Sequence, residues 1–157
     1  MKATSKPDNP GVVIPPPLLY AAGVGLGAWL DHLVPLFVYS QRPARIVSVL
    51  CIVLWLVFSG SAIGLFRRAK TSIIPIRPAN ALVTGGIYRF TRNPMYVGLV
   101  FLYLAFSFWF GFAWPLVLLP VVIALVHVLA IAPEEHYLQR RFGQLYRDYQ
   151  ARVRRWL

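Results

Sequence analysis

Acidic residues are scarce in this chain. Its 157 residues include 5 Asp and Glu against 16 Lys and Arg, and charged residues make up 13% of the sequence, about half of the usual share. The same sequence is 58% hydrophobic, which is more apolar surface than a soluble domain of this length can bury. Disordered and nucleic-acid-binding tails are excluded as well, because such segments are polar. An apolar chain whose few charges are basic is typical of an integral membrane protein.

Cysteine is almost absent too. Cys51 is the one cysteine and lies in an apolar run, which excludes an intramolecular disulfide and a metal site built from several cysteines. Lys2 and Lys6 precede an apolar stretch, as they would in a signal peptide. Because prolines open that stretch and no small-x-small cleavage site follows, we expect the segment to be retained.

Four apolar segments have about the length that a membrane-spanning helix needs. A bilayer core takes about 20 helical residues, and the four segments are 18–39, 46–66, 95–114 and 115–132. The first is the weakest, because Asp31 and His32 interrupt it. Strands are implausible, since no alternation of about 10 residues recurs. We predict an all-α fold, a polytopic membrane bundle of about four transmembrane helices plus a C-terminal amphipathic helix.

The basic residues indicate which membrane face each end of the bundle occupies. If both termini are cytoplasmic, 14 of the 16 Lys and Arg residues are cytoplasmic too, and only Arg42 and Arg45 lie on the other side. The positive-inside rule favours this arrangement. The aromatic residues within 108–114 then form a belt at the opposite face. Asp31 and His32 also fall on that face, where we expect solvation at a helix end or a salt bridge with Arg42 or Arg45.

We divide the chain into five consecutive parts of one membrane domain. They are an N-terminal arm (1–17), two membrane helices (18–66), a cytoplasmic loop (67–94), a helical hairpin (95–132) and a C-terminal cytoplasmic helix (133–157). In the last part, apolar residues recur at helical spacing among arginines, which predicts an amphipathic helix on anionic lipid. Gly143 is the point at which this helix could break into two pieces.

Glycines form three patterns in the apolar segments. Gly23/Gly27 and Gly60/Gly64 have the spacing that lets helices approach closely, and we expect helix packing at both pairs. The run 23–28, GVGLGA, also fits the G-x-G-x-x-A pattern of dinucleotide-binding folds. That interpretation fails, because such a fold needs a strand before the glycines and an acidic residue about 20 positions later.

The predicted cytoplasmic loop is long and apolar. Loops of more than about 15 residues are usually functional or disordered, and residues such as Leu82 and Ile87 make this loop too apolar for disorder. Pro75, Pro78 and Gly85 set turns within it. We therefore expect the loop to pack on the rest of the protein.

The loop ends in a motif suited to an anion. Pro94 suits the first turn of a helix, and Arg92 and Asn93 then lie where free backbone N–H groups and the helix dipole favour negative charge. Tyr96 adds a ring and a hydroxyl, and Gly98 permits a close approach to the backbone. The alternative is an ordinary helix start with an arginine that reaches the membrane surface.

Two of the five acidic residues, Glu134 and Glu135, stand side by side after the last apolar segment. Carboxylates at a membrane boundary are costly unless they are paired or hydrated, which indicates Arg92 or a cationic ligand as a partner. The alternative is solvation, or salt bridges to arginines of the tail. His127 and His136 do not complete a metal-binding spacing, and we predict no metal site.

Two blocks of the sequence resemble one group of membrane enzymes. Residues 82–98, LVTGGIYRFTRNPMYVG, resemble the G-x-Y-x-x-x-R-[HN]-P-x-Y-x-G block of the isoprenylcysteine carboxyl methyltransferase and phospholipid methyltransferase families. Residues 134–149, with EEHYL followed by FGQLYRDY, resemble their C-terminal EE-x-x-L and FG-x-x-Y-x-x-Y block. A helical hairpin separates the two blocks, as it does in those enzymes.

The resemblance implies a methyltransferase of a bacterial inner membrane that uses S-adenosylmethionine in a cytoplasm-facing pocket. Arg92 and Glu135 are the implied catalytic residues, with Arg92 on the cofactor carboxylate and Glu134 and Glu135 on its amino group or ribose. Aromatic rings would wrap the sulfonium. The implied cofactor-binding residues are Val83, Gly86, Tyr88, Arg92, Asn93, Pro94, Tyr96, Gly98, Glu134 and Glu135.

The implied reaction is direct methyl transfer to a lipophilic acceptor, which is a carboxylate, a thiol or an amine. The acceptor would enter from the bilayer near the second and third helices, and no nucleic acid is involved. Asn93 stands where the prenylcysteine enzymes have His, so a prenylated protein does not follow as the acceptor.

Two other functions compete with this interpretation. An NADPH-dependent membrane reductase of the sterol-reductase type carries a similar R-H-P-x-Y-x-G-E block, from which this chain departs at Asn93 and Leu99. A non-enzymatic four-helix membrane protein, such as a small exporter, would need an ionisable residue deep in the bundle. It would also leave the long apolar loop unexplained.

Overall fold

The computed structural model describes residues 10–12, 14–36, 39–71 and 79–157, and within these ranges every regular element is a helix. The predicted all-α fold is confirmed. The interpretations of Lys2, Lys6, Pro75 and Pro78 concern residues outside these ranges. The elements are α1 (Pro16–Leu33), α2 (Gln41–Arg68), the 3-10 turn η1 (Gly86–Arg89), α3 (Pro94–Phe110), α4 (Trp114–Val126), the π-helical segment η2 (His127–Ile131), α5 (Ala132–Phe142) and α6 (Gln144–Arg152).

Two helices of the described chain are long and apolar enough to cross a membrane. They are α2 and the continuous rod from Trp114 to Phe142 that α4, η2 and α5 form. Helix α3 is apolar but has 17 residues, and α1 is not a candidate by the same measure. Helix α1 ends at Leu33, earlier than the predicted limit at residue 39. The prediction of about four transmembrane helices is thus supported for two, and for α1 and α3 it stays a prediction.

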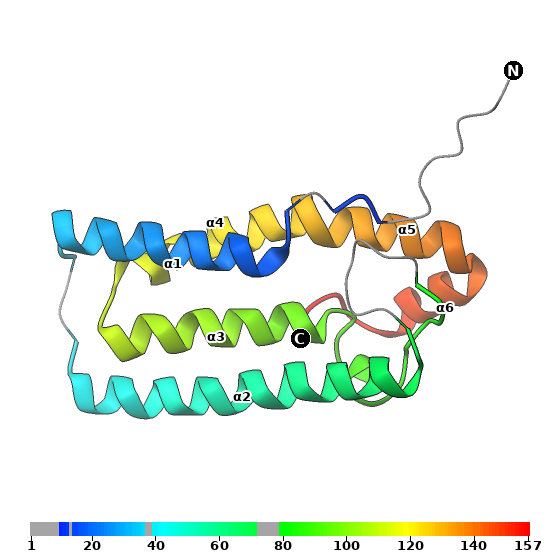
Figure 1. Cartoon of the computed structure of the whole chain (residues 1–157), viewed down its shortest axis with the longest axis horizontal. Coiled ribbons are helices and arrows are strands. Elements are labelled where there is room, and N and C mark those ends of the chain that lie inside the picture. Colours follow the sequence, from blue (N-terminus) through cyan, green and yellow to red (C-terminus); the bar gives the residue numbers. More distant parts are fainter. Residues whose placement is uncertain (1–9, 13, 37–38, 72–78) are drawn as a thin grey trace, which may run out of the picture.

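Helix α3 lies at the centre of the bundle. Helix α2 packs along one side of it, while α1 and α4 pack together on the other side (Figure 1). Helices α1 and α2 therefore flank α3 and make little contact with each other. The core between α1, α3 and α4 includes Tyr20, Tyr103 and Val122, all of them buried.

The glycine pairs of α1 and α2 differ in what surrounds them. Gly23 and Gly27 lie against α4, where an added Cβ atom would collide with a side chain, that of Pro115 in the case of Gly27. Helix packing at this pair is confirmed. A Cβ atom on Gly60 or Gly64 would meet nothing within 4 Å. The same prediction for the second pair is therefore wrong, because this face of α2 points away from the neighbouring helices.

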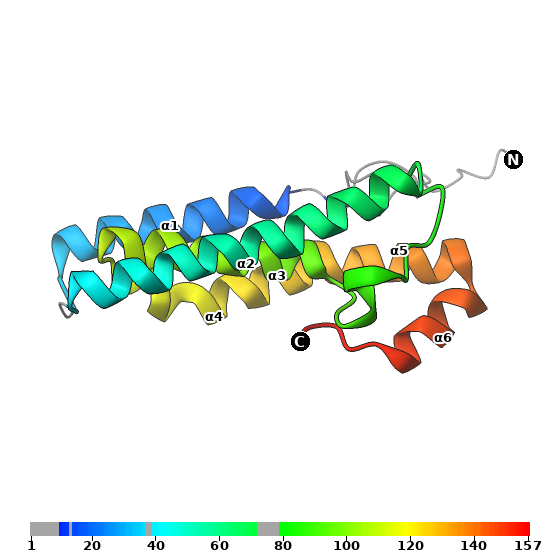
Figure 2. The same ribbon diagram turned by 90° about the horizontal axis from the view of Figure 1, so that it is seen from below.

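The two ends of the bundle are built differently. The end of α1, the start of α2, the end of α3 and the start of α4 lie at one end, whereas η1, α5 and α6 lie toward the other; the C-terminus returns to the start of α3 (Figures 1 and 2). At the first end, Trp114 N–H at the start of α4 donates to Asp31 Oδ2 at 3.0 Å, which satisfies a free helix-start donor. Of the two alternatives expected for Asp31, the salt bridge with Arg42 or Arg45 is not formed among the described residues, and the carboxylate instead accepts this helix-start N–H.

A widened turn joins α4 to α5. Pro133 has no N–H to give to the carbonyl four residues earlier, and in the preceding turn Ala132 N–H donates to the carbonyl of His127, five residues back. One extra residue in a turn rotates the following helix by about 100°. π-Helical turns of this kind occur often at functional sites, and this one directly precedes Glu134 and Glu135.

The C-terminal part is two helices rather than one. Helix α5 continues α4, and at Gly143, with φ 56°, the chain turns and α6 folds back toward the bundle (Figure 2). The predicted single amphipathic helix is therefore wrong, while the break at Gly143 is confirmed. The aromatic face of α6 packs on the protein, since Tyr146 and Tyr149 are buried with Tyr88 and Ala62.

Gly98 provides a test of the contact between α2 and α3. A Cβ atom at Gly98 would collide with Ser59 Oγ, so we expect Gly98→Ala to lower the free energy of unfolding by about 1–3 kcal/mol. Gly60→Ala is the matched control and should be neutral or stabilising by up to about 1 kcal/mol. Thermal unfolding in detergent measures both effects, and adding Ser59→Ala should restore most of the loss. Equal effects of the two alanine variants would contradict this packing.

Candidate functional site

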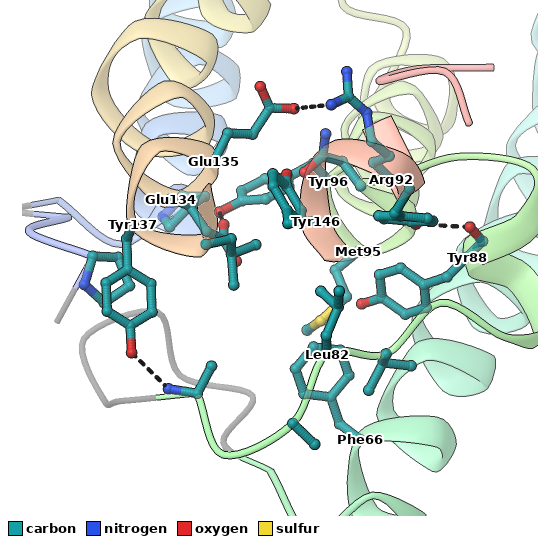
Figure 3. Close-up of a pocket in the computed structure, with 18 of the residues that line it drawn as sticks. Phe66, Leu82, Tyr88, Arg92, Met95, Tyr96, Glu134, Glu135, Tyr137 and Tyr146 are labelled. Atoms are coloured by element: carbon teal, nitrogen blue, oxygen red, sulfur yellow. Dashed lines mark hydrogen bonds and ion pairs between the residues drawn. The ribbon is translucent and has the colours of Figure 1, made fainter. Parts of the chain in front are cut away.

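A cavity of about 330 Å³ lies at the end of the bundle that carries α5 and α6 (Figure 3). Its volume falls at the small end of the range for ligand pockets. Side chains from α1, α2, α3, α5, α6 and the segment 79–93 meet there. The lining residues are Pro10, Pro15, Pro16, Pro17, Phe66, Ala79, Ala81, Leu82, Val83, Tyr88, Arg92, Asn93, Met95, Tyr96, Leu99, Glu134, Glu135, Tyr137, Leu138, Tyr146 and Tyr149.

Most of the residues predicted for the site line this cavity. They are Val83, Tyr88, Arg92, Asn93, Tyr96, Glu134 and Glu135. Three others have different positions. Gly86 forms a turn with φ 58° against Leu65, and Gly98 faces Ser59 of α2. Pro94 is buried as the first residue of α3. These three shape the backbone around the cavity without lining it.

Arg92 brings buried hydrogen-bond donors into the cavity. Its Nη1 atom is 3.3 Å from Glu135 Oε1, and 11% of the Arg92 side chain is exposed. Within the described part of the chain, Nε and Nη1 have no hydrogen-bond acceptor. A buried guanidinium with unsatisfied N–H groups is costly. The cost is recovered if a negatively charged ligand accepts these donors.

Glu135 is a buried carboxylate held by two arginines. Arg155 Nε donates to Oε1 at 3.1 Å and Arg155 Nη2 donates to Oε2 at 2.7 Å, a bidentate pair of the strong kind. Arg92 completes the cluster through its ion pair with Oε1. The two partners that the sequence offered as alternatives, Arg92 and a tail arginine, are therefore both present.

Glu134 lies beside it in a different environment. Tyr96 Oη donates to Glu134 Oε2 at 2.7 Å. Burial raises the pKa of Glu134 above its ordinary value of 4.5, the hydrogen bond from Tyr96 opposes the rise, and the charge on Glu135 adds to it. The apolar part of the rod has ended before this residue, so Glu134 faces the cavity rather than lipid.

Tyrosines of α5 and α6 anchor the segment 79–93. Tyr137 Oη accepts the N–H of Ala79 at 3.0 Å, and Tyr149 Oη donates to the carbonyl of Tyr88 at 2.7 Å. Burial raises the pKa of Tyr149 to about 12, with Arg92 opposing the rise, so its hydroxyl stays a donor. The segment is packed, as its apolar composition predicts.

The cavity has a polar side and an apolar side. Arg92 and Glu135 lie together on one side, and Phe66, Leu82 and Met95 gather on the other (Figure 3). The three prolines 15–17 at the start of α1 also line the wall. Their contribution was missed, because a proline cluster indicates a helix start but not which surface that start covers.

The sequence matches a known family over the region that builds most of this site. The family model for phospholipid methyltransferase matches residues 43–145. An uncharacterized protein of Haemophilus influenzae is 42% identical over 65 residues, which are 40% of this chain and 100% of that protein. No solved structure matches the chain. The matched region includes Arg92, Glu134 and Glu135, whereas α1 and Arg155 lie outside it.

The raised pKa of Glu134 leads to a pH-dependent stability. In the unfolded chain Glu134 releases its proton near pH 4.5, whereas in the folded state it keeps the proton to a higher pH. Between these two pKa values the free energy of unfolding therefore falls as pH rises. Glu134→Gln should flatten that fall, and Asp148→Asn, on the exposed face of α6, should not. The measurement is the midpoint of thermal unfolding between about pH 5 and pH 8. Parallel pH profiles of wild type and Glu134→Gln would refute the assignment.

Proposed function

The chain belongs to the phospholipid methyltransferase family, and on this premise we propose that it transfers a methyl group from S-adenosylmethionine to a lipophilic acceptor. The observation that carries the proposal is the pairing, in one cavity, of buried and unsatisfied Arg92 donors with the carboxylate of Glu134. An amino-acid ligand has a carboxylate and an ammonium group a few ångströms apart. The cavity offers one partner for each.

The donor set of the cavity fits the cofactor. Arg92 Nε and Nη1 bind the carboxylate, because they are the buried donors without an acceptor. Glu134 binds the ammonium group, since both oxygens of Glu135 are already bound by Arg155. Rings of Tyr88 and Tyr146 in the wall favour a neighbouring cation. When bound, S-adenosylmethionine supplies a methyl group that its sulfonium has already activated.

The protein contributes orientation and the exclusion of water. The wall contains no His, Lys or Cys among the described residues, and both carboxylates have hydrogen-bond donors. With Glu134 assigned to the ammonium group and Glu135 bound by Arg155, neither carboxylate is assigned to the acceptor. Proximity and desolvation are sufficient for a nucleophile that arrives ready to react, which agrees with a carboxylate, a thiolate or an unprotonated amine as the acceptor.

The acceptor reaches the cavity between α1 and α2. The sequence predicts a route near the second and third helices, and these two helices pack closely where Gly98 meets Ser59. Helices α1 and α2 make little contact, and Pro16 of α1 and Phe66 of α2 both line the cavity. A lipid-soluble molecule can enter there if α1 and α3 also span a bacterial inner membrane, with both termini cytoplasmic.

Binding experiments on detergent-purified protein test this function. Calorimetry should detect S-adenosylmethionine and its demethylated product, and should detect no NADPH, the cofactor of the competing reductase. Arg92→Ala should weaken binding of S-adenosylmethionine about tenfold or more, because about 1.4 kcal/mol or more of carboxylate recognition is lost. Arg89→Ala, an exposed neighbour outside the cavity, should stay within about twofold. A wild-type protein that binds neither the cofactor nor its product would overturn the proposal.

A further inference from the structure

The chain after α6 lies across the start of α3, and we refer to residues 153–157 as the C-terminal strap. Arg92 N–H donates to the carbonyl of Arg154 at 2.9 Å. Asn93 Nδ2 donates to the carbonyl of Arg155 at 3.1 Å. These bonds fix the strap backbone to the turn that carries Arg92. The side chain of Arg155 is thereby held at a defined place beside the cavity.

The strap brings a second arginine to one carboxylate. Arg155 uses Nε and Nη2 to bind both oxygens of Glu135, whose side chain is 9% exposed. Arg92 is left with a contact of 3.3 Å to Oε1 and with Nε and Nη1 unsatisfied. Two guanidinium groups share the carboxylate of Glu135, and Arg155 has the larger share, because it makes the two hydrogen bonds.

The loss of Arg155 would change the partner of Glu135. Its carboxylate would then be buried with Arg92 as the nearest cation, and planar guanidinium and carboxylate groups pair through two parallel hydrogen bonds. Such a pair would occupy N–H groups of Arg92 that now have no hydrogen-bond acceptor. It would also neutralise the charge of Arg92.

We propose that Arg155 is a positioning residue: by binding both oxygens of Glu135, it limits the hold of Glu135 on Arg92 to one ion pair of 3.3 Å, so that N–H groups of Arg92 remain for the carboxylate of the bound ligand. This inference rests on the proposed function, because it takes that ligand to be S-adenosylmethionine. Arg155 does not line the cavity and acts through Glu135 alone. The C-terminal strap is thus a part of the binding site that lies outside the residues matched by the family model.

Two ligands that differ in one group distinguish this role from a merely structural one. S-adenosylmethionine carries the carboxylate, and decarboxylated S-adenosylmethionine lacks it. Arg155→Ala should weaken binding of the first about tenfold and of the second less than about twofold, so that the ratio of the two affinities falls. Arg155→Lys should recover part of the ratio, since it keeps a cation near Glu135. Arg154→Ala is the matched control, because this residue uses its backbone carbonyl to contact Arg92.

A second background tests whether Arg155 acts through Glu135. In Glu135→Gln the neutral side chain no longer competes strongly for Arg92, so adding Arg155→Ala should cost less than about twofold in affinity for S-adenosylmethionine. A full tenfold loss in that background would mean that Arg155 contacts the ligand directly, and would overturn the proposal.

The remaining outcomes separate this inference from the proposed function. If Arg155→Ala leaves the ratio of the affinities for the two ligands unchanged, the role of Arg155 is overturned. Binding of S-adenosylmethionine by the wild type would still support the proposed cofactor. A wild type that binds neither ligand would overturn the proposed function itself. Thermal unfolding without ligand verifies that each variant is folded.

Discussion

The buried carboxylate of Glu135 is the constraint on which the site depends. A charge in a dry environment must be paired and hydrogen-bonded, and removing one partner leaves a large uncompensated cost. Here the partners come from the start of α3 and from the end of the chain, while Glu135 itself lies on α5. The ion cluster therefore ties together three regions that are far apart in the sequence. The turn at Gly143 and the return of α6 bring the last of these regions within reach.

The sequence predicted well those features that local chemistry determines. Arg92 and the acidic pair share a site because few charges can be left unpaired at a membrane boundary, and the two sequence blocks resemble one family. The break at Gly143 followed from the freedom of glycine. The partner of Glu135 could not be singled out, because Arg155 is one of several tail arginines and the fold of α6 alone selects it. The sequence interpretation assigned Gly98 to cofactor binding, whereas in the structure it packs against Ser59. A glycine that leaves room for a ligand cannot be distinguished by sequence from one that leaves room for a neighbouring side chain.

The region matched by the family model contains only part of the residues that line the cavity. Residues 43–145 supply Arg92, both carboxylates and much of the apolar wall. The prolines of α1, which close the wall beside the proposed acceptor route, lie before the matched region. In the proposed function, the residues assigned to the cofactor therefore lie inside the matched region, and the prolines beside the proposed acceptor route lie before it.

The continuous rod of α4, η2 and α5 has a consequence for the depth of the chemistry. A helix rises about 1.5 Å per residue, so Glu134 stands about 30 Å along the rod from Trp114, which is about the thickness of the hydrocarbon core of a bilayer. If the rod spans a bilayer, as its length and composition permit, Trp114 would lie near one boundary and the carboxylates near the other. The length of the rod would thus set the depth of Glu134 and Glu135 in the membrane. In the proposed function, the water-soluble cofactor and the lipid-dissolved acceptor would meet at that depth, the cofactor arriving from water and the acceptor from the bilayer.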